Sequence, residues 1–568
     1  MSKQKKKNKT KGHWEVELLI SFKDIYPDLT PLDIVATLSQ ISRDKIFKWV
    51  KILLSNSNGF EKLTRSKHLS LFSPFIDGFN RRCQKFTLEK RGFPYKYSFV
   101  SILTELELLR YIFSITNSKW KLFRSTNRES FIKIILLVNE EITQRNGGDM
   151  EIKNRPDLEK RLFAMLFSQG DIVNFNPNET FRDQLIHFVY FKEFIETNEE
   201  FKSICDIFLK MLGIDSLYTY FKQIFLLWTK FGVVGKRYLS HNEIPNGVTE
   251  SVLDYISIPY DQNVPLDSNS DYKAFRDKPL IKMPDGGYLL TYERFLLEKI
   301  FYCLQFDFAK IQEERGKKWD NSVYSFEYME KYFLYRLLRE INSTNIYFAK
   351  SGVECGKRGY DGEPDYYLKS KETGNIILFE NKSVLINSGT KQEGNYDEIT
   401  EVWEKKALSK PRDGKDGHKV VGVGQLIRNI RRVINNDVFW DNDISGSAKI
   451  YPVLVLSDIR QVSAEHTNMF QEMFAKECQK HQIPLRRVGH LILMPITTLK
   501  LYENEFQNRG LECYFECYYK KLKRSQSVSG DLHFYQTLVS FPEFMGKHFT
   551  NNREIVHQDL ISRLQMRL

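Results

Sequence analysis

The spacing of apolar residues changes near residue 320, and this change constrains the fold more than any other feature of the chain. Before it, from Trp14 to Phe231, apolar residues recur at helical intervals, as at Ile34, Leu38 and Ile41. After it, short apolar runs of strand length alternate with helical segments. The pattern predicts an α+β multidomain protein, with an all-α N-terminal region followed by an α/β domain.

A chain of 568 residues is too long for one hydrophobic core, so several domains are expected. The connector between the two main regions contains a hairpin signal, in which Leu280–Met283 and Tyr288–Tyr292 flank a turn at Asp285, and a helix follows from about Glu293. We predict a basic disordered tail at 1–13, a helical domain at 14–231, a connector with a hairpin and a helix at 232–319, an α/β domain at 320–500 and a C-terminal helical extension at 501–568.

Charge and composition exclude some classes of protein. The formal net charge is +12, but half of this excess comes from six lysines within the first twelve residues, so charge permits a polyanionic partner without establishing one. No apolar run is long enough to span a membrane. The seven cysteines are scattered and odd in number, which argues against a zinc site and favours a reduced, cytoplasmic protein. No phosphate-binding loop motif of a nucleotide-driven motor occurs.

Residues 320–500 predict a helix, three strands, a helix and a strand, with further elements after them. The first helix should place Phe326, Met329, Phe333 and Leu337 on one face. A polar segment at 387–419 separates the third strand from the next helix. The expected elements are a helix at 323–341, strands at 345–349, 365–369 and 376–382, a helix at 422–436, a strand at 450–456, a helix at 464–480 and a strand at 489–494.

Charged residues gather at the ends of two of these strands. Pro364-Asp365 opens the second strand, and Glu380-Asn381-Lys382 ends the third. Side chains alternate along a strand, so Glu380 and Lys382 should share a face, with Asp365 beside them if the strands pair antiparallel. Two carboxylates and one ammonium would then converge, and carboxylate oxygens are ligands that suit Mg²⁺ or Mn²⁺.

The alternative interpretation is an ordinary charged hairpin, with Asp365 in a turn and Glu380 and Lys382 as a surface ion pair. Spacing argues for the metal site. The chain contains four Pro-Asp pairs and four Glu-x-Lys triplets, but only Asp365 is followed by such a triplet within twenty residues.

The order of elements and the charged pattern resemble the PD-(D/E)xK nuclease superfamily, which has the restriction-endonuclease-like αβββαβ fold. The resemblance covers residues 320–500. It implies Asp365 and Glu380 as metal ligands, with the carbonyl of Asn381 also facing the ion and Lys382 as the catalytic lysine. The implied cofactor is Mg²⁺, with Mn²⁺ as the alternative.

Other residues take roles from the same resemblance. A glutamate on the first core helix would match Glu327, with Glu330 one turn later as the alternative. A glutamine on the helix after the third strand would match Gln425. Arg428 and Arg432 share a face with Gln425, which suits contact with nucleic-acid phosphates or simply a solvated helix surface. Two further acids, Glu354 and Glu363, are close enough in sequence to substitute at the metal.

The resemblance implies a metal-dependent endonuclease, acting on DNA in preference to RNA. Such domains joined to helical regions often act as effectors of prokaryotic defence against phage or plasmids, or as restriction-type enzymes. The helical region would then bind a partner protein or form a homo-oligomer. Two alternatives stay open, a non-catalytic scaffold that binds nucleic acid or protein on a nuclease-like fold, and an RNA-cleaving toxin with the same centre.

Overall fold

The computed structural model divides the chain into two compact units, Met1–Met150 with Ser525–Leu538, and Glu151–Arg524 with Val539–Leu568. No helix within the described ranges is long and apolar enough to cross a membrane. The predicted basic tail at 1–13 lies outside them. The described residues are 17–56, 96–120, 128–145, 155–233, 236–356, 362–411, 418–526, 539–549 and 552–565.

The first unit is mainly helical and has two short parallel strands. Asn139, a buried residue of the last helix, connects the two strands. Its side chain donates hydrogen bonds to the carbonyls of Ile20 (2.8 Å) and Phe99 (2.9 Å), which directly follow the strands. Thr104 in turn donates to the Asn139 side chain. Its elements are β1 (Glu17–Leu19), α1 (Phe22–Ile25), α2 (Ile34–Ser39), α3 (Arg43–Asn56), β2 (Lys96–Ser98), α6 (Ile102–Ser114), η2 (Asn117–Lys119) and α7 (Arg128–Arg145).

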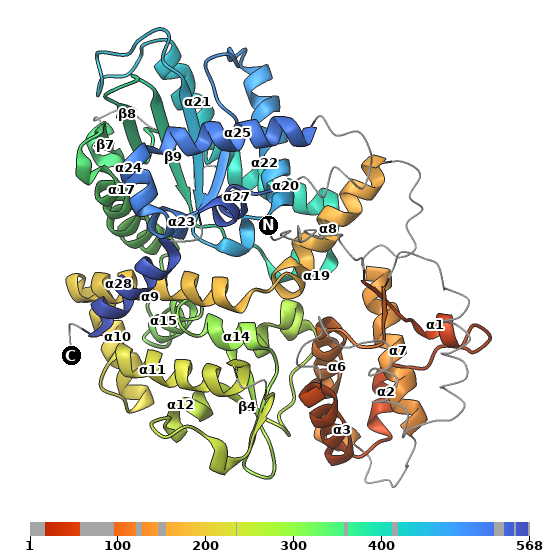
Figure 1. Ribbon diagram of the computed structural model, residues 1–568. Helices are drawn as coiled ribbons and strands as arrows, with labels where there is room; N and C mark the ends of the chain where they lie inside the picture. The colour runs from red at the N-terminus through yellow and green to blue at the C-terminus, as the bar shows by residue number, and fades with distance from the viewer. Residues whose placement is uncertain are drawn as a thin grey trace, which may run out of the picture. The chain divides into compact units, whose positions relative to one another are not determined.

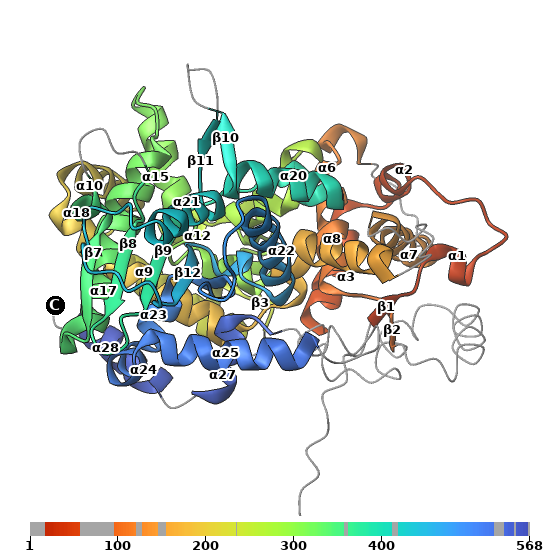
Figure 2. The same cartoon turned by 90° about the horizontal axis from the view of Figure 1, so that it is seen from above.

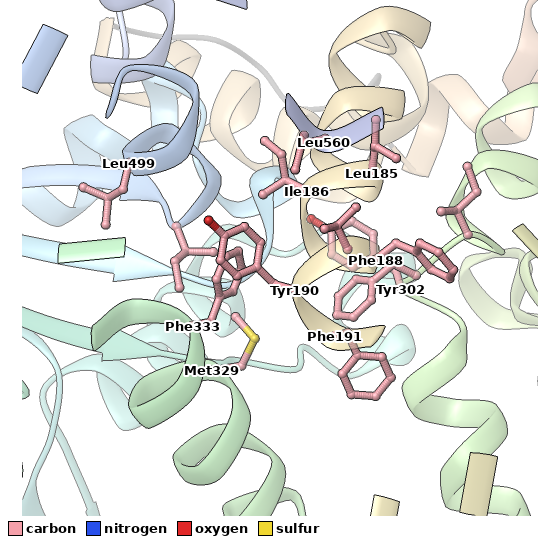
Figure 3. Packing of buried hydrophobic residues seen from close by; sticks show 14 of the residues in the cluster. Leu185, Ile186, Phe188, Tyr190, Phe191, Tyr302, Met329, Phe333, Leu499 and Leu560 are labelled. Carbon is pink, nitrogen blue, oxygen red and sulfur yellow. The ribbon is translucent and has the colours of Figure 1, made fainter. Parts of the chain in front are cut away.

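The second unit begins with helices that share a core with the α/β region. On α9, Tyr190 packs against Phe333 with ring centroids 4.7 Å apart, and Figure 3 shows α9 side chains beside Met329 and Phe333. The helices before residue 231 are thus divided near residue 150, which differs from the predicted single domain at 14–231. The first elements of this unit are α8 (Arg155–Val173), α9 (Pro177–Thr197), α10 (Glu199–Leu212), α11 (Leu217–Trp228) and the π-helix η3 (Thr229–Val233).

The connector folds as a four-stranded sheet with short helices. The predicted hairpin is confirmed, since β5 and β6 pair antiparallel around Gly286, whose φ of 76° suits glycine in the turn. The predicted helix at Glu293 is confirmed as α14, whereas β3 and β4 had no sequence signal. The elements are β3 (Tyr238–Leu239), η4 (His241–Glu243), α12 (Glu250–Tyr255), β4 (Ser257–Pro259), η5 (Asp267–Tyr272), α13 (Lys273–Asp277), β5 (Leu280–Lys282), β6 (Tyr288–Leu290), α14 (Glu293–Glu298) and α15 (Leu304–Glu314).

A five-stranded mixed sheet with the order β13-β12-β9-β8-β7 forms the centre of the unit. The β7–β8 and β8–β9 pairs are antiparallel, whereas the β9–β12 and β12–β13 pairs are parallel. The predicted order of elements is confirmed, and the bounds of β9 and β12 are those expected. The elements are α16 (Asn321–Val323), the π-helix η6 (Tyr324–Leu334), α17 (Tyr335–Ile341), η7 (Asn342–Thr344), β7 (Tyr347–Ser351), α18 (Gly352–Cys355), β8 (Tyr366–Ser370), β9 (Ile376–Lys382), α21 (Val423–Ile434), β12 (Ile450–Leu456), η8 (Ile459–Gln461), α22 (Ala464–Lys480) and β13 (Ile492–Pro495).

Alternating side chains of β9 bury both faces of this sheet. Ile377 and Phe379 belong to the core beneath η6 and α17, whereas Ile376 and Leu378 belong to the core beneath α21 and α22. Figure 2 shows α21 and α25 on opposite sides of the sheet. The described residues therefore form a mixed α+β protein, as expected.

The described residues of the polar segment, 387–411 and 418–419, are structured, and those of the predicted C-terminal extension are mainly helical. Two helices of the polar segment (Figure 1) precede an antiparallel pair of strands (Figure 2). Within α25, the ring centroid of Phe515 lies 5.9 Å from that of Tyr451, and the aromatic residues of this helix are buried in the core. The elements are α19 (Ser388–Glu393), α20 (Tyr396–Ala407), β10 (Ser409–Pro411), β11 (His418–Val420), α23 (Thr497–Leu501), α24 (Glu503–Arg509), α25 (Leu511–Gln526), α27 (Phe541–His548) and α28 (Asn552–Gln565).

Candidate active site

Asp365 lies at the start of β8, directly beside the charged end of β9. Its main-chain N–H donates to the carbonyl of Phe379 at 3.0 Å, so the antiparallel ladder reaches this residue. Its side chain accepts a hydrogen bond of 2.6 Å from the main-chain N–H of Asn381. The predicted juxtaposition of Asp365 with the Glu-Asn-Lys triplet is therefore present, and the ordinary surface hairpin is not what forms.

Glu380 and Lys382 project from the same face of β9, toward α21. The Lys382 ammonium lies 2.6 Å from Glu380 Oε1. The side chain of Glu380 is fully buried, because β9 has a neighbouring strand on either side, and its Oε2 has no hydrogen-bond partner among the described residues. A buried carboxylate oxygen without a partner is costly, and a ligand that binds there would remove this cost.

The helix carboxylate at the site is Glu330, so the preference for Glu327 is wrong. Glu327 pairs with Lys331 of its own helix and does not line the cavity around Asp365, whereas Glu330 does. The cause is the π-helical winding of η6, in which main-chain hydrogen bonds join residues five apart, as from Tyr335 N–H to the Glu330 carbonyl. Phe326 is 42% exposed on the cavity wall, whereas Met329, Phe333 and Leu337, which were predicted to share its face, are buried.

Helix α21 holds the loop that precedes Asp365. Gln425 donates to the carbonyl of Glu363 at 2.8 Å, and Arg432 donates to the carbonyl of Gly362 at 3.1 Å. Gln425 is thus at the site as predicted. Arg432 therefore binds the loop, and Arg428 packs beside Gly362, while contact of either arginine with nucleic-acid phosphates stays a prediction.

The two alternative acids have different positions. Glu354 accepts hydrogen bonds from the main chain and the hydroxyl of Ser351, so it caps α18 and is not directed to the site. Glu363 lines the cavity near Asp365. Of the two, only Glu363 is available to the chemistry of the site.

A cavity of about 640 Å³ opens over these groups. Its floor carries Glu330, Asp365 and Lys382, and Phe326 and Val353 expose apolar surface on one wall. The opposite wall comes from α20 and the β10–β11 hairpin, a segment that the sequence showed only as polar. Its four cations, here named the lysine wall, are Lys405, Lys406, Lys410 and Lys419.

Burial and mutual repulsion favour the protonated forms of the three carboxyl groups. Burial raises the pKa of Glu330 to about 8, with a further contribution from the charge of Asp365. Burial also raises the pKa of Glu380 well above its ordinary value, and that of Asp365, against the attraction of Lys382. The pKa of Lys382 is raised, because attraction to Glu380 and Asp365 outweighs the opposing effect of its burial.

These groups fit a divalent cation by their chemistry. Among the described residues no three His, Cys, Asp or Glu side chains are already close enough to share one ion. Asp365 and Glu380 nevertheless offer carboxylate oxygens at one end of the sheet, and one oxygen of Glu380 has no partner. A cation between them would offset the repulsion that raises their pKa values.

Comparison of the chain with protein-family models, with curated proteins and with solved structures found no match.

Proposed function

We propose that the second unit contains a metal-dependent nuclease centre of the restriction-endonuclease-like type, which hydrolyses phosphodiester bonds of DNA in preference to RNA. The observation that carries the proposal is the hydrogen bond from Asn381 N–H to Asp365, which places Asp365 beside Glu380 and Lys382 beneath a cavity with a wall of lysines. A surface ion pair would not bury Glu380 completely or face a lysine-rich cavity.

The residues at the cavity floor suit hydrolysis of a phosphodiester. Mg²⁺ bound by Asp365 and Glu380 would polarise the phosphate and lower the pKa of a bound water. Lys382 keeps its charge at neutral pH, so its ammonium would stabilise negative charge that develops on phosphate oxygens. Glu330, with a pKa of about 8, would exchange a proton near neutral pH, as a general base must.

The lysine wall would bind the phosphates on either side of the reacting one. Lys410 and Lys419 are exposed and have no ion-pair partner among the described residues, unlike Lys405, which pairs with Glu401. Burial raises the pKa of Asp365, and attraction to Lys419 is one of the effects that oppose this rise, so this lysine lies near the centre. Unpaired lysines beside a nucleolytic centre supply the electrostatic part of nucleic-acid binding.

The test is cleavage of plasmid DNA and of structured RNA with Mg²⁺ at low salt, with Asp365→Asn and Lys382→Ala as the active-site variants. Asp206→Asn and Lys202→Ala are the matched controls, because they make the same changes on exposed positions of α10, where Lys202 belongs to another Glu-x-Lys triplet. Circular dichroism melting establishes that every variant folds.

Each active-site variant should lower the cleavage rate by about a hundredfold or more, while both controls cleave at the wild-type rate. Cleavage of RNA alone, lost in the same variants, would keep the centre and change the substrate class. Equal cleavage by all five proteins would refute the assignment. A folded protein that neither cleaves nor binds Mg²⁺ by calorimetry would favour the non-catalytic scaffold.

A further inference from the structure

A second cavity, of about 690 Å³, lies in the same unit and shares one wall with the first. It is enclosed by residues of α13, α15, η8 and the segment 383–393 that follows β9. We name this segment the strap, because it joins the end of β9 to α20, the helix that begins the lysine wall. Val384 of the strap lines both cavities.

The buried cations of this second cavity already have carboxylate partners. Arg276 pairs with Asp171 at 2.6 Å and with Glu298 at 3.2 Å. Arg460 pairs with Asp458 at 2.6 Å, and Lys391 of the strap pairs with Asp271 at 2.8 Å. An anionic ligand would therefore have to displace a buried carboxylate from its cation, which is costly.

Two buried acceptors in the cavity have no partner. The side chain of Asp171 is 4% exposed, and its Oδ1 accepts no hydrogen bond within the described residues, although its Oδ2 pairs with Arg276. Gln461 is 8% exposed, and its Oε1 likewise accepts none, although its amide donates to the carbonyl of Val384 at 2.6 Å. Both unpaired atoms are oxygens, so a ligand must supply hydrogen-bond donors.

The cavity also exposes apolar surface. The ring of Phe306 is 46% exposed and Leu385 of the strap is 39% exposed, and both line the cavity. Large side chains exposed inside a concave site, beside a few placed polar atoms, are typical of small-molecule sites. An exposed aromatic face suits a planar ring.

We propose that the second cavity binds a small planar ring compound that carries amino or amidinium donors, neutral or cationic, with its ring against Phe306 and its donors on Asp171 and Gln461. The pairing of Arg276, Arg460 and Lys391 disfavours a carboxylate or phosphate ligand at these cations. No residue of the proposed nuclease centre takes part in this binding.

Occupancy of this cavity is linked to the nuclease centre through the strap, a consequence that rests on the proposed function. The strap is held from both sides. Gln461, in the second cavity, binds the Val384 carbonyl, and Lys406, of the lysine wall, donates to the Leu385 carbonyl at 2.7 Å. A ligand that contacts Leu385 and Gln461 restricts the movement of the strap. It thereby also restricts the positions of Lys382, which precedes the strap, and of α20, which follows it.

The test compares benzamidine with benzoate, which have the same ring but carry donors on one and a carboxylate on the other. Calorimetry on the full chain should detect benzamidine binding in the millimolar range, at about 10 mM ligand, and none of benzoate. Phe306→Ala should weaken binding about tenfold, and Phe306→Trp should restore it, since the indole ring replaces the lost face. Leu485→Ala is the matched control, because Leu485 is 63% exposed and lines neither cavity.

Hydrogen exchange with bound benzamidine should slow at the main-chain amides of 383–393, and this readout does not depend on nuclease activity. Absence of benzamidine binding, equal binding of benzoate, or binding that Phe306→Ala leaves unchanged would each overturn the ligand site. Binding without slower exchange in 383–393 would overturn the linkage alone. Failure of cleavage in the nuclease assay would leave benzamidine binding and the slower exchange standing and would remove only their link to nuclease activity.

Discussion

Lys410 and Lys419 are direct partners in the antiparallel β10–β11 pair. Like charges placed opposite each other destabilise a two-stranded ladder, and no carboxylate among the described residues forms an ion pair with either one. An arrangement that costs stability and faces a cavity is explained when a polyanion occupies that cavity. If the proposed function holds, this pair of strands is the part of the lysine wall expected to contact the substrate.

Replacing both residues, Lys410→Gln with Lys419→Gln, should weaken DNA binding about tenfold and lower the slope of log affinity against log salt by about 1.5. The same double variant should melt at a slightly higher temperature, because the repulsion is gone. Fluorescence anisotropy at several salt concentrations measures the first effect. Lys202→Gln with Lys210→Gln, on exposed α10, makes an equal charge change, and equal loss in this control would assign the effect to net charge.

The raised pKa of Glu330 predicts that the metal-free protein becomes less stable as pH rises. The folded state holds the proton up to about pH 8, whereas the unfolded chain releases it near 4.5. Between these pH values the folded state binds more protons than the unfolded chain, so the free energy of unfolding falls as the pH rises. The contribution of the Glu330 proton to stability is complete below about pH 4.5 and is lost as the pH approaches and passes 8. The raised pKa values of Asp365 and Glu380 act in the same direction.

Urea denaturation in EDTA from pH 5 to pH 9 measures this loss. Glu330→Gln, which cannot ionise, should flatten the decline and unfold at higher urea than the wild type at pH 9. Glu327→Gln changes the neighbouring helix carboxylate, which pairs with Lys331 in partial exposure, and should follow the wild-type curve. A parallel decline in all three proteins would show that Glu330 does not titrate in this range.

Prediction from the sequence was most accurate for strands whose side chains are buried along their whole length. The apolar runs of β9 and β12 occupy the middle of the sheet, with strands on both sides, and their predicted bounds match the structure. The pairing of Asp365 with the end of β9 followed from the turn between two adjacent strands. Neither prediction required knowledge of contacts between residues that are distant in the sequence.

The positions of the lysine wall and of the helix carboxylate depend on structural features that local sequence patterns do not indicate. Strands β10 and β11 are short and exposed, so they show no apolar alternation. The resemblance favoured Glu327, whereas Glu330 of the π-helical η6 lines the cavity. The division of the helices near residue 150 depends on packing of α9 against η6, which no spacing within either segment reveals.

Tyr335→Phe should shift the pH dependence of cleavage upward. The Tyr335 hydroxyl donates to Glu330 Oε1 at 2.6 Å, and this bond lowers the pKa of Glu330 against the effect of burial. Without it, Glu330 needs a higher pH to ionise, while the buried ring keeps its packing, so the stability loss should be about 1 kcal/mol. Cleavage rates from pH 6 to pH 9 show the shift. Tyr514→Phe removes a comparable bond to Glu505 and should leave the profile unchanged.

Gly362→Ala should reduce cleavage much more than it reduces stability. Gly362 has φ of 85°, and a Cβ there would overlap the guanidinium of Arg428. The substitution therefore displaces the α21 side chains that hold the loop before Asp365, and misplacing a catalytic carboxylate by even a fraction of an ångström should lower the rate about tenfold or more.

Gly374→Ala is the control for this effect, because Gly374 has φ of 71° in the turn between β8 and β9 but a Cβ there would meet nothing within 4 Å. Both variants carry the same backbone strain of about 1 kcal/mol. Gly374→Ala should thus melt at a similarly reduced temperature and cleave at nearly the wild-type rate. Equal loss of cleavage in the two variants would attribute the effect to backbone strain and remove the loop–α21 contact from the account of the site.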